Sequence, residues 1–274
     1  MNRLSPLRAL VGSFRAFLYV GALEFASYPM QIVDRLLSLG TVVVLLGFAG
    51  TLVDVDTTEH ALGPSYFVFA VTGFAMLQVF TSTMTLFRTR VRHFQLHGVL
   101  EAGAMTRTPV WAFLCGAPAF DLTWSLVQGA ALVGGVHLVT GTAVEPVRAM
   151  AAFGIAILAG AVFAALGLVA AAGVLVFKQG EPLTRAVTIA TLLFGGTFVP
   201  RSALPAWLDV PGGWLPIAPA LDAMRAALYG APWSDVTEPL IRLAIVGGVV
   251  VVLAVLAIRV AIRAVLREGS LGHY

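Results

Sequence analysis

Apolar residues occur along this chain in long runs that are separated by short polar stretches. An α-helix needs roughly 20 apolar residues to cross the hydrocarbon core of a bilayer, within a range of about 17–25. Six runs reach this length. They predict helices over Met30–Val53, Pro64–Phe87, Ala112–Val139, Val147–Phe177, Leu183–Val199 and Pro239–Ile262. The pattern therefore predicts an all-α integral membrane protein with six transmembrane helices.

The segment before these runs, Ser5–Phe25, has the periodicity of a surface helix. Apolar residues, Phe14 among them, recur at helical spacing, and Arg8 and Arg15 fall on the opposite side. A helix of this kind lies along a membrane surface with its apolar side in the lipid. A poorly ordered tail is the alternative interpretation. We expect the helix, and we expect Pro29 to separate it from the first span.

The third run is longer than one crossing, and Pro118 lies near its start. A proline inside a helix removes a backbone hydrogen bond and often breaks the helix. We therefore expect an interfacial piece before Pro118 and a crossing piece after it. Asp121 follows closely, and an uncompensated charge in hydrocarbon is costly. Asp121 is either paired inside the membrane or solvated at the cytoplasmic boundary, and the sequence favours the solvated position.

The segment between the fifth and sixth runs, Pro200–Glu238, is too apolar for a free loop and too interrupted for a spanning helix. Irregular backbone at membrane depth must be buried in protein or line a cavity, and tryptophan favours the headgroup level. We expect short re-entrant helices at the outer membrane face. The interrupting prolines are Pro200, Pro205, Pro211, Pro216, Pro219 and Pro232, and the tryptophans are Trp207, Trp214 and Trp233.

The basic residues set the orientation, because lysine and arginine gather on the cytoplasmic side of membranes. With the N-terminus inside, 13 of them are cytoplasmic and 4 are external. Both termini are therefore predicted to be cytoplasmic. The cytoplasmic set is Arg3, Arg8, Arg15, Arg35, Arg88, Arg90, Arg92, Arg107, Lys178, Arg185, Arg259, Arg263 and Arg267, and the external set is Arg148, Arg201, Arg225 and Arg242.

Composition excludes several classes of protein. Charged residues make up 11% of the 274 residues and apolar residues 59%, whereas a soluble domain carries about 25% charged residues. The net charge of +3 reflects membrane orientation, so no nucleic-acid partner is expected. Cys115 is the only cysteine, which excludes a disulfide within the chain. The chain has no phosphate-binding GxxxxGK[ST] motif, so ATP cannot bind here in the P-loop manner.

Several polar and small residues inside the predicted membrane segments have two interpretations. The second span carries Gln78, Thr81, Ser82, Thr83 and Thr85, which either line a conduit or bond neighbouring helices; helix bonding is the commoner role. In the fourth span, small residues at four-residue spacing favour close packing within the chain or across a dimer. These residues are Ala152, Ala156, Gly160 and Ala164. Asp222 and Arg225 lie three residues apart and are expected to pair within one short helix.

The longest hydrophilic stretch, Arg88–Pro109, begins with basic residues and continues into an amphipathic helical run over Phe94–Met105. It is either a basic loop held at anionic lipid headgroups or a docking helix for a cytoplasmic partner. Its spacing alone favours neither interpretation.

Four motifs, in order, favour the docking helix. They are Glu101 followed by MTRTPVW at Met105–Trp111, GGTFVPRSALPAWL at Gly195–Leu208, LPIAPALDAMRAALYG at Leu215–Gly230, and REGSLGHY at Arg267–Tyr274. Together they resemble the permeases of ABC-2 type transporters along nearly the whole chain. The stretch CGAPAFDL at Cys115–Leu122 departs from the family pattern, which is smoother and more apolar there.

The resemblance implies one transmembrane domain over residues 1–274, with an interface helix at 5–25, a coupling loop at 88–109 and an outer re-entrant segment at 200–238. Predicted coupling residues are Leu100, Glu101, Met105, Thr106, Arg107, Thr108 and Pro109; interface residues are Arg8, Phe14 and Arg15; exit residues are Pro200, Leu204, Pro205, Trp207, Trp214, Asp222 and Arg225.

The resemblance also implies partners and a function. The chain would be the non-enzymatic permease of an ATP-driven exporter in the bacterial cytoplasmic membrane. It would pair with a second permease copy, preferably identical, and with two ATPase subunits that bind ATP and Mg²⁺. Membrane lipids surround it. An amphipathic or lipid-linked polysaccharide or glycolipid is the favoured substrate, with drug efflux as the alternative. An ATP-independent carrier or an intramembrane enzyme is the competing class, but it would need acids or a catalytic cluster within the spans.

Overall fold

The computed structural model describes residues 6–52, 65–96, 110–177 and 181–268, which form helices and no strand. Six helices in this part of the chain are long and apolar enough to cross a membrane. Five belong to predicted spans: α2 (Pro29–Leu52), α3 (Tyr66–Leu96), α6 (Ala119–Thr140) with the preceding α5 (Val110–Gly116), α7 (Pro146–Phe177) and α11 (Trp233–Glu268). The all-α membrane fold is therefore confirmed.

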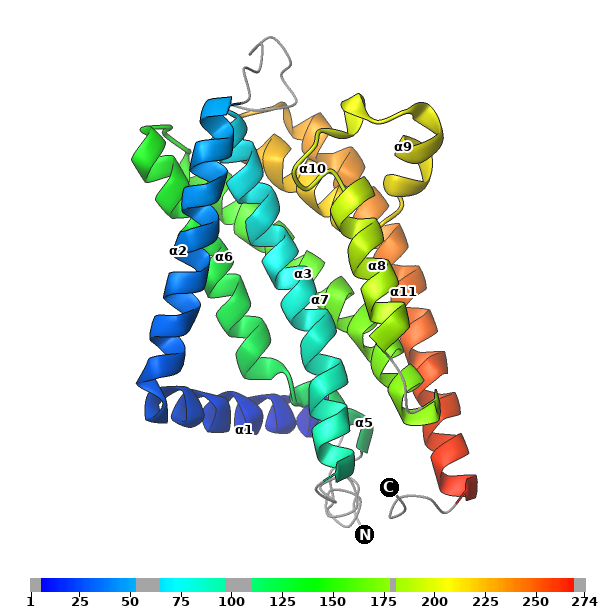
Figure 1. Cartoon of the computed structure of the whole chain (residues 1–274). Helices are drawn as coiled ribbons and strands as arrows, with labels where there is room; N and C mark the ends of the chain where they lie inside the picture. The colour runs from blue at the N-terminus through cyan, green and yellow to red at the C-terminus, as the bar shows by residue number, and fades with distance from the viewer. Residues whose placement is uncertain (1–5, 53–64, 97–109, 178–180, 269–274) are drawn as a thin grey trace.

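The sixth of these helices is α1 (Pro6–Ser27), the predicted interface helix. It lies across one end of the bundle, at a steep angle to α2 and α6 (Figure 1). Its packed face is made of small residues, Ala9, Ser13 and Gly21, which meet α5 and α6. A Cβ atom on Gly21 would collide with the Phe120 side chain, so α6 approaches the backbone of α1 closely.

The predicted fifth span is shorter than expected. Helix α8 (Glu181–Phe194) has 14 residues, about 21 Å at 1.5 Å per residue, against a hydrocarbon core of about 30 Å. The prediction extended it to Val199. The helix ends early because Gly196 adopts a left-handed conformation (φ 73°), as glycine commonly does beyond a helix C-terminus. Gly195 also leaves no room for a Cβ, which would lie 2.5 Å from Ile217.

Two other helices have boundaries that differ from the prediction. Helix α3 continues to Leu96, beyond the predicted end at Phe87, because its polar end extends the helix past the apolar run. Helix α11 begins at Trp233 and contains Pro239, which was predicted to be its first residue. The predicted break at Pro118 is confirmed, since α5 ends at Gly116 and α6 begins at Ala119.

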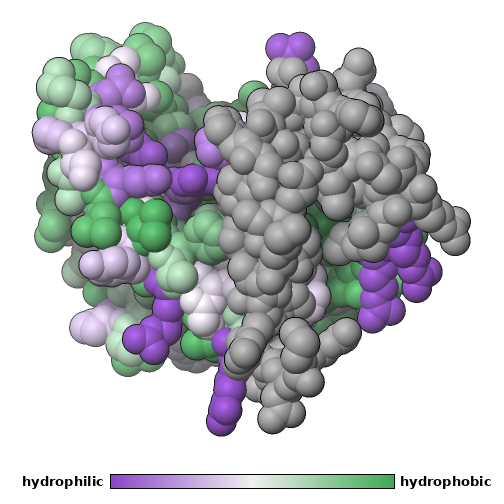
Figure 2. Space-filling model, turned by 90° about the horizontal axis from the view of Figure 1, so that it is seen from below, coloured by the Kyte–Doolittle hydropathy of each residue, from purple (hydrophilic) through white to green (hydrophobic). Residues whose placement is uncertain are grey.

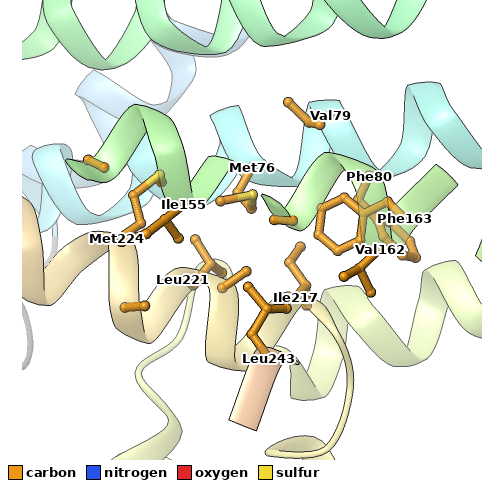
Figure 3. Packing of buried hydrophobic residues seen from close by; sticks show 14 of the residues in the cluster. Met76, Val79, Phe80, Ile155, Val162, Phe163, Ile217, Leu221, Met224 and Leu243 are labelled. Atoms are coloured by element: carbon orange, nitrogen blue, oxygen red, sulfur yellow. The ribbon is translucent and has the colours of Figure 1, made fainter. Parts of the chain in front are cut away.

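The core of the bundle surrounds α10 (Ile217–Leu228), which packs on α3, α7 and α11. Ile217 and Leu221 are fully buried and point toward residues from these three helices (Figure 3). Phe80 of α3 and Phe163 of α7 meet edge to face, with ring centroids 5.1 Å apart. Two short helices, η2 (Arg201–Ala203) and α9 (Ala206–Gly212), precede α10. The predicted re-entrant segment thus contains three short helices, the last of which is a core element, and its final residues form the start of α11.

Candidate functional site

The predicted coupling residues lie outside the described residues, because the structure does not describe 97–109. They are Leu100, Glu101, Met105, Thr106, Arg107, Thr108 and Pro109. The helices that flank them, α3 and α5, lead to the end of the molecule where α1 lies (Figure 1). Figure 2 shows this end from below, with hydrophilic side chains gathered among hydrophobic ones on the part not drawn in grey. Arg8, Phe14 and Arg15 are exposed on α1.

An ion-pair cluster joins four helices near this end. The Asp121 carboxylate of α6 lies 3.3 Å from Arg90 of α3 and 3.9 Å from Arg35 of α2. Arg90 also lies 3.9 Å from Glu24 of α1. The favoured solvated position of Asp121 is wrong, since its side chain is only 11% exposed. Two arginines compensate its charge, which is the condition for burying a carboxylate in a membrane protein.

A polar cavity of about 320 Å³ lies beside this cluster, between α2, α3 and α6. Of the polar residues in the second span, Gln78, Ser82 and Thr85 line it. Thr81 and Thr83 instead donate to carbonyl oxygens of their own helix, at 2.9 and 2.6 Å. The conduit interpretation fits Gln78, Ser82 and Thr85. The bonds of the two threonines lie within α3 and join it to no neighbouring helix.

At the opposite end, Arg201 of η2 connects this short helix with α9 and α10. Its guanidinium donates to Asp222 of α10 at 2.7 Å and to Asp209 of α9 at 2.8 Å. Burial raises the pKa of Asp222, and the Arg201 charge opposes this shift. The predicted pair of Asp222 with Arg225 is wrong, because the aspartate faces Arg201 of the preceding helix η2 while the arginine faces the core. The sequence signal for Arg201 was that it is the only charged residue between Arg185 and Asp209.

Arg225 fastens α10 to α3 and to the turn after α8. It is buried and donates hydrogen bonds to three carbonyl oxygens, those of Gly196 (2.7 Å), Thr197 (3.0 Å) and Phe69 (3.0 Å). The guanidinium carbon lies 3.5 Å from the centroid of the Phe69 ring. Burial lowers the pKa of Arg225 to about 10, so the side chain remains charged at neutral pH. Gly73 allows this approach, because a Cβ there would collide with the Thr197 carbonyl oxygen.

The remaining predicted exit residues occupy the same end as Arg201. Pro200 and Pro205 directly precede η2 and α9. Leu204 is half-buried between those two helices. Trp207 and Trp214 are exposed, at 74% and 57%. Their exposure fits the predicted headgroup position.

The small-residue stripe of α7 serves two purposes. A Cβ on Gly160 would lie 3.5 Å from Leu122 of α6, which is close helix packing. Ala152 and Ala156 instead line an apolar cavity between α6 and α7. Within the described residues, helix packing is therefore confirmed at Gly160, and Ala152 and Ala156 also pack in the core cluster while they border the cavity.

In a comparison with protein families, the model of the family described as ABC-2 type transporter matches residues 13–229. No match was found among curated proteins. The matched range contains most of α1, the segment 97–109, and the residues Arg201 and Arg225 with their partners. It spans well over half of the chain. The chain therefore belongs to the ABC-2 type transporter family and is a multi-pass transmembrane subunit of an ABC transporter.

Proposed function

We propose that this permease serves an ATP-driven exporter of an amphipathic or lipid-linked substrate, with a lipid-linked polysaccharide or glycolipid favoured over a drug. Residues at 97–109 and the exposed face of α1 dock on an ATPase subunit, which binds ATP and Mg²⁺. The observation that carries this proposal is the ion-pair cluster. Glu24, Arg90, Asp121 and Arg35 connect α1 and the end of α3 with α2 and α6.

The cluster supplies a route for mechanical coupling. When the ATPase subunits close on ATP, the docked segment and α1 move together. Charged groups only 3.3–3.9 Å apart then carry this displacement to α2, α3 and α6. These three helices border the polar cavity, so a change in their spacing changes the size of that cavity. The chain itself contributes the path, and ATP hydrolysis takes place on the partner.

The exposed surface of α2 supports a second permease copy. No residue of α2 is buried in the single chain, and Leu36, Leu37 and Phe48 are each at least 60% exposed. The same helix contributes Asp34 and Arg35 to the polar cavity. A homodimer that pairs along α2 would cover the apolar residues and place two polar cavities near one axis, where the substrate crosses.

The membrane and orientation follow from the same proposal. The start of α1 and the end of α11 lie at one end of the bundle (Figure 1). We assign this end to the cytoplasm of a bacterium, because the arginines of the predicted cytoplasmic set that the structure describes belong to it. The opposite end, with Trp207 and Trp214, is then external, and the short helices α9 and α10 border the exit.

The test uses the permease and its ATPase together in proteoliposomes. Glu101→Lys, combined with replacement of 102–109 by a glycine–serine linker, should abolish both the permease-stimulated ATPase activity and export of a fluorescent lipid-linked glycan. The control is Glu238→Lys, a charge reversal on an exposed residue at the other end of the molecule, and it should leave both activities unchanged. If the complex with the replaced loop still coupled ATPase activity fully to export, the docking role would be wrong. Transport by the permease without any ATPase would favour the carrier hypothesis.

A further inference from the structure

An apolar cavity of about 630 Å³ lies between α6 and α7, with α3 and α10 behind it. Leu122 and Leu126 of α6 lie against Gly160 of α7 at one end of this interface. Beyond that contact the cavity occupies the space between the two helices. It extends from Leu126 and Ala156 to the loop residues Thr142 and Ala143. Its lining is dominated by alanine, valine, leucine and methionine side chains.

The length of the cavity matches one leaflet of a membrane. Leu126 and His137 both line it and lie 11 residues apart on α6. At 1.5 Å per residue this is about 16 Å, against about 15 Å for half of a hydrocarbon core of about 30 Å. The cavity therefore covers the leaflet opposite α1, from the middle of the membrane to its surface.

One polar side chain stands at the surface end of the cavity. His137 is 7% exposed, and its Nδ1 lies 2.8 Å from the carbonyl oxygen of Val133. A carbonyl oxygen only accepts, so Nδ1 carries the hydrogen, and in the neutral ring Nε2 is then an acceptor. Nε2 is buried and has no hydrogen-bond partner among the described residues. A buried acceptor without a partner is unfavourable, and a donor that enters the cavity would remove this cost.

We propose that this cavity binds one acyl chain of a phospholipid from the leaflet opposite α1, and that the lipid headgroup donates a hydrogen bond to His137 Nε2. The occupant is a phospholipid with a headgroup donor, such as the ammonium group of phosphatidylethanolamine. Phosphatidylcholine has the same chains but no headgroup donor, so it should bind less well. This inference needs only the membrane position of α6 and α7 and does not depend on the transported substrate.

The probe is phosphatidylethanolamine with a photoactivatable diazirine in one acyl chain, compared with phosphatidylcholine carrying the same chain. The purified full-length protein is reconstituted into vesicles of each lipid, irradiated and digested, and crosslinks are mapped by mass spectrometry. We expect crosslinks concentrated on Gly129–Val133 and Ala152–Ala156. Phosphatidylethanolamine should give about fivefold more of them than phosphatidylcholine, the factor expected for one hydrogen bond.

Two variants separate cavity binding from general lipid contact. Gly134 lines the cavity, and a Cβ added there meets no atom within 4 Å, so Gly134→Leu places a side chain in the open space. It should reduce these crosslinks at least fivefold. Gly135→Leu is the matched control, since Gly135 does not line the cavity and a Cβ there also meets nothing within 4 Å. It should crosslink like the unmodified protein.

His137→Leu tests the headgroup contact without filling the cavity. It should remove the preference for phosphatidylethanolamine and leave chain crosslinking at the phosphatidylcholine level, whereas His137→Gln should retain part of the preference. Crosslinks spread evenly over the exposed faces of α2 and α7 would overturn the proposal. So would undiminished crosslinking of a folded Gly134→Leu variant. Gel filtration and thermal unfolding establish that each variant is folded.

Discussion

Replacing Arg225 by methionine tests whether α10 is held in place by backbone hydrogen bonds. The substitution keeps a long flexible side chain but removes three donors, and the carbonyl oxygens of Phe69, Gly196 and Thr197 lose this partner. Each buried carbonyl left unpaired costs about 1–3 kcal/mol. Methionine recovers part of this loss, because a buried charge no longer has to be desolvated. We expect a net loss of about 3–5 kcal/mol in the free energy of unfolding.

The assay is thermal unfolding of the detergent-solubilised protein, followed by a thiol-reactive fluorophore. Cys115 is the only cysteine in the chain and is partly buried, so its reaction reports loss of the fold. A loss of 3–5 kcal/mol should lower the Tm by about 10 °C, since about 1 kcal/mol corresponds to roughly 2–4 °C in a chain of this size. Arg225→Lys keeps the charge but not the planar fork of donors. Its Tm should therefore lie between that of the unmodified protein and that of Arg225→Met.

Arg242→Met is the matched control. Arg242 pairs with the exposed Glu238 four residues away on the same helix, at 2.6 Å. An exposed pair of this kind contributes less than about 1 kcal/mol, so the Tm should fall by no more than about 2 °C. If Arg225→Met and Arg242→Met unfolded within 2 °C of each other, the three carbonyl contacts would have no role in holding α10. This description of the Arg225 contacts would then be refuted.

Three further substitutions test other contacts. Gly73→Ala should lower the Tm strongly, because a Cβ there collides with the Thr197 carbonyl, while Gly40→Ala meets no neighbour and should leave it unchanged; equal Tm values would contradict the close approach of α3. Gly21→Leu should detach α1 from α6 and make α1 accessible to protease. Gly12→Leu, on the open side of α1, should not. If α1 were equally protected from protease in both variants, this packing would be contradicted. Asp121→Asn should reduce ATPase stimulation severalfold in the reconstituted complex, and full stimulation would remove the cluster from the coupling route.

The hydrophobic pattern predicted the membrane helices well, because length and apolarity are direct requirements of the bilayer. The break at Pro118 was also visible, since proline removes a backbone donor. The early end of α8 was not visible in the sequence, because it depends on the left-handed conformation of Gly196. A glycine pair within an apolar run does not by itself stop a helix.

The partners of charged residues were harder to predict than the helices. Spacing paired Asp222 with Arg225, but tertiary packing turns the aspartate toward Arg201 and the arginine toward backbone carbonyls. Asp121 was assigned to water because its partners, Arg35 and Arg90, lie far away in sequence. Such contacts depend on how helices pack, which no local pattern contains. The family motifs predict the coupling segment, which remains a prediction, and they include Arg201, Asp222 and Arg225, whose contacts the structure supplied.

The most direct test of the central claim is ATP-dependent transport by the reconstituted complex. The permease is combined with an ATPase subunit that co-purifies with it, and flux of a fluorescent lipid-linked glycan is measured with ATP and Mg²⁺ and with a non-hydrolysable analogue. We predict flux only when the permease, the ATPase and hydrolysable ATP are all present. Equal flux from the permease alone, or a permease that captures no ATPase and never stimulates one, would contradict the assignment of this chain as the membrane subunit of an ATP-driven exporter.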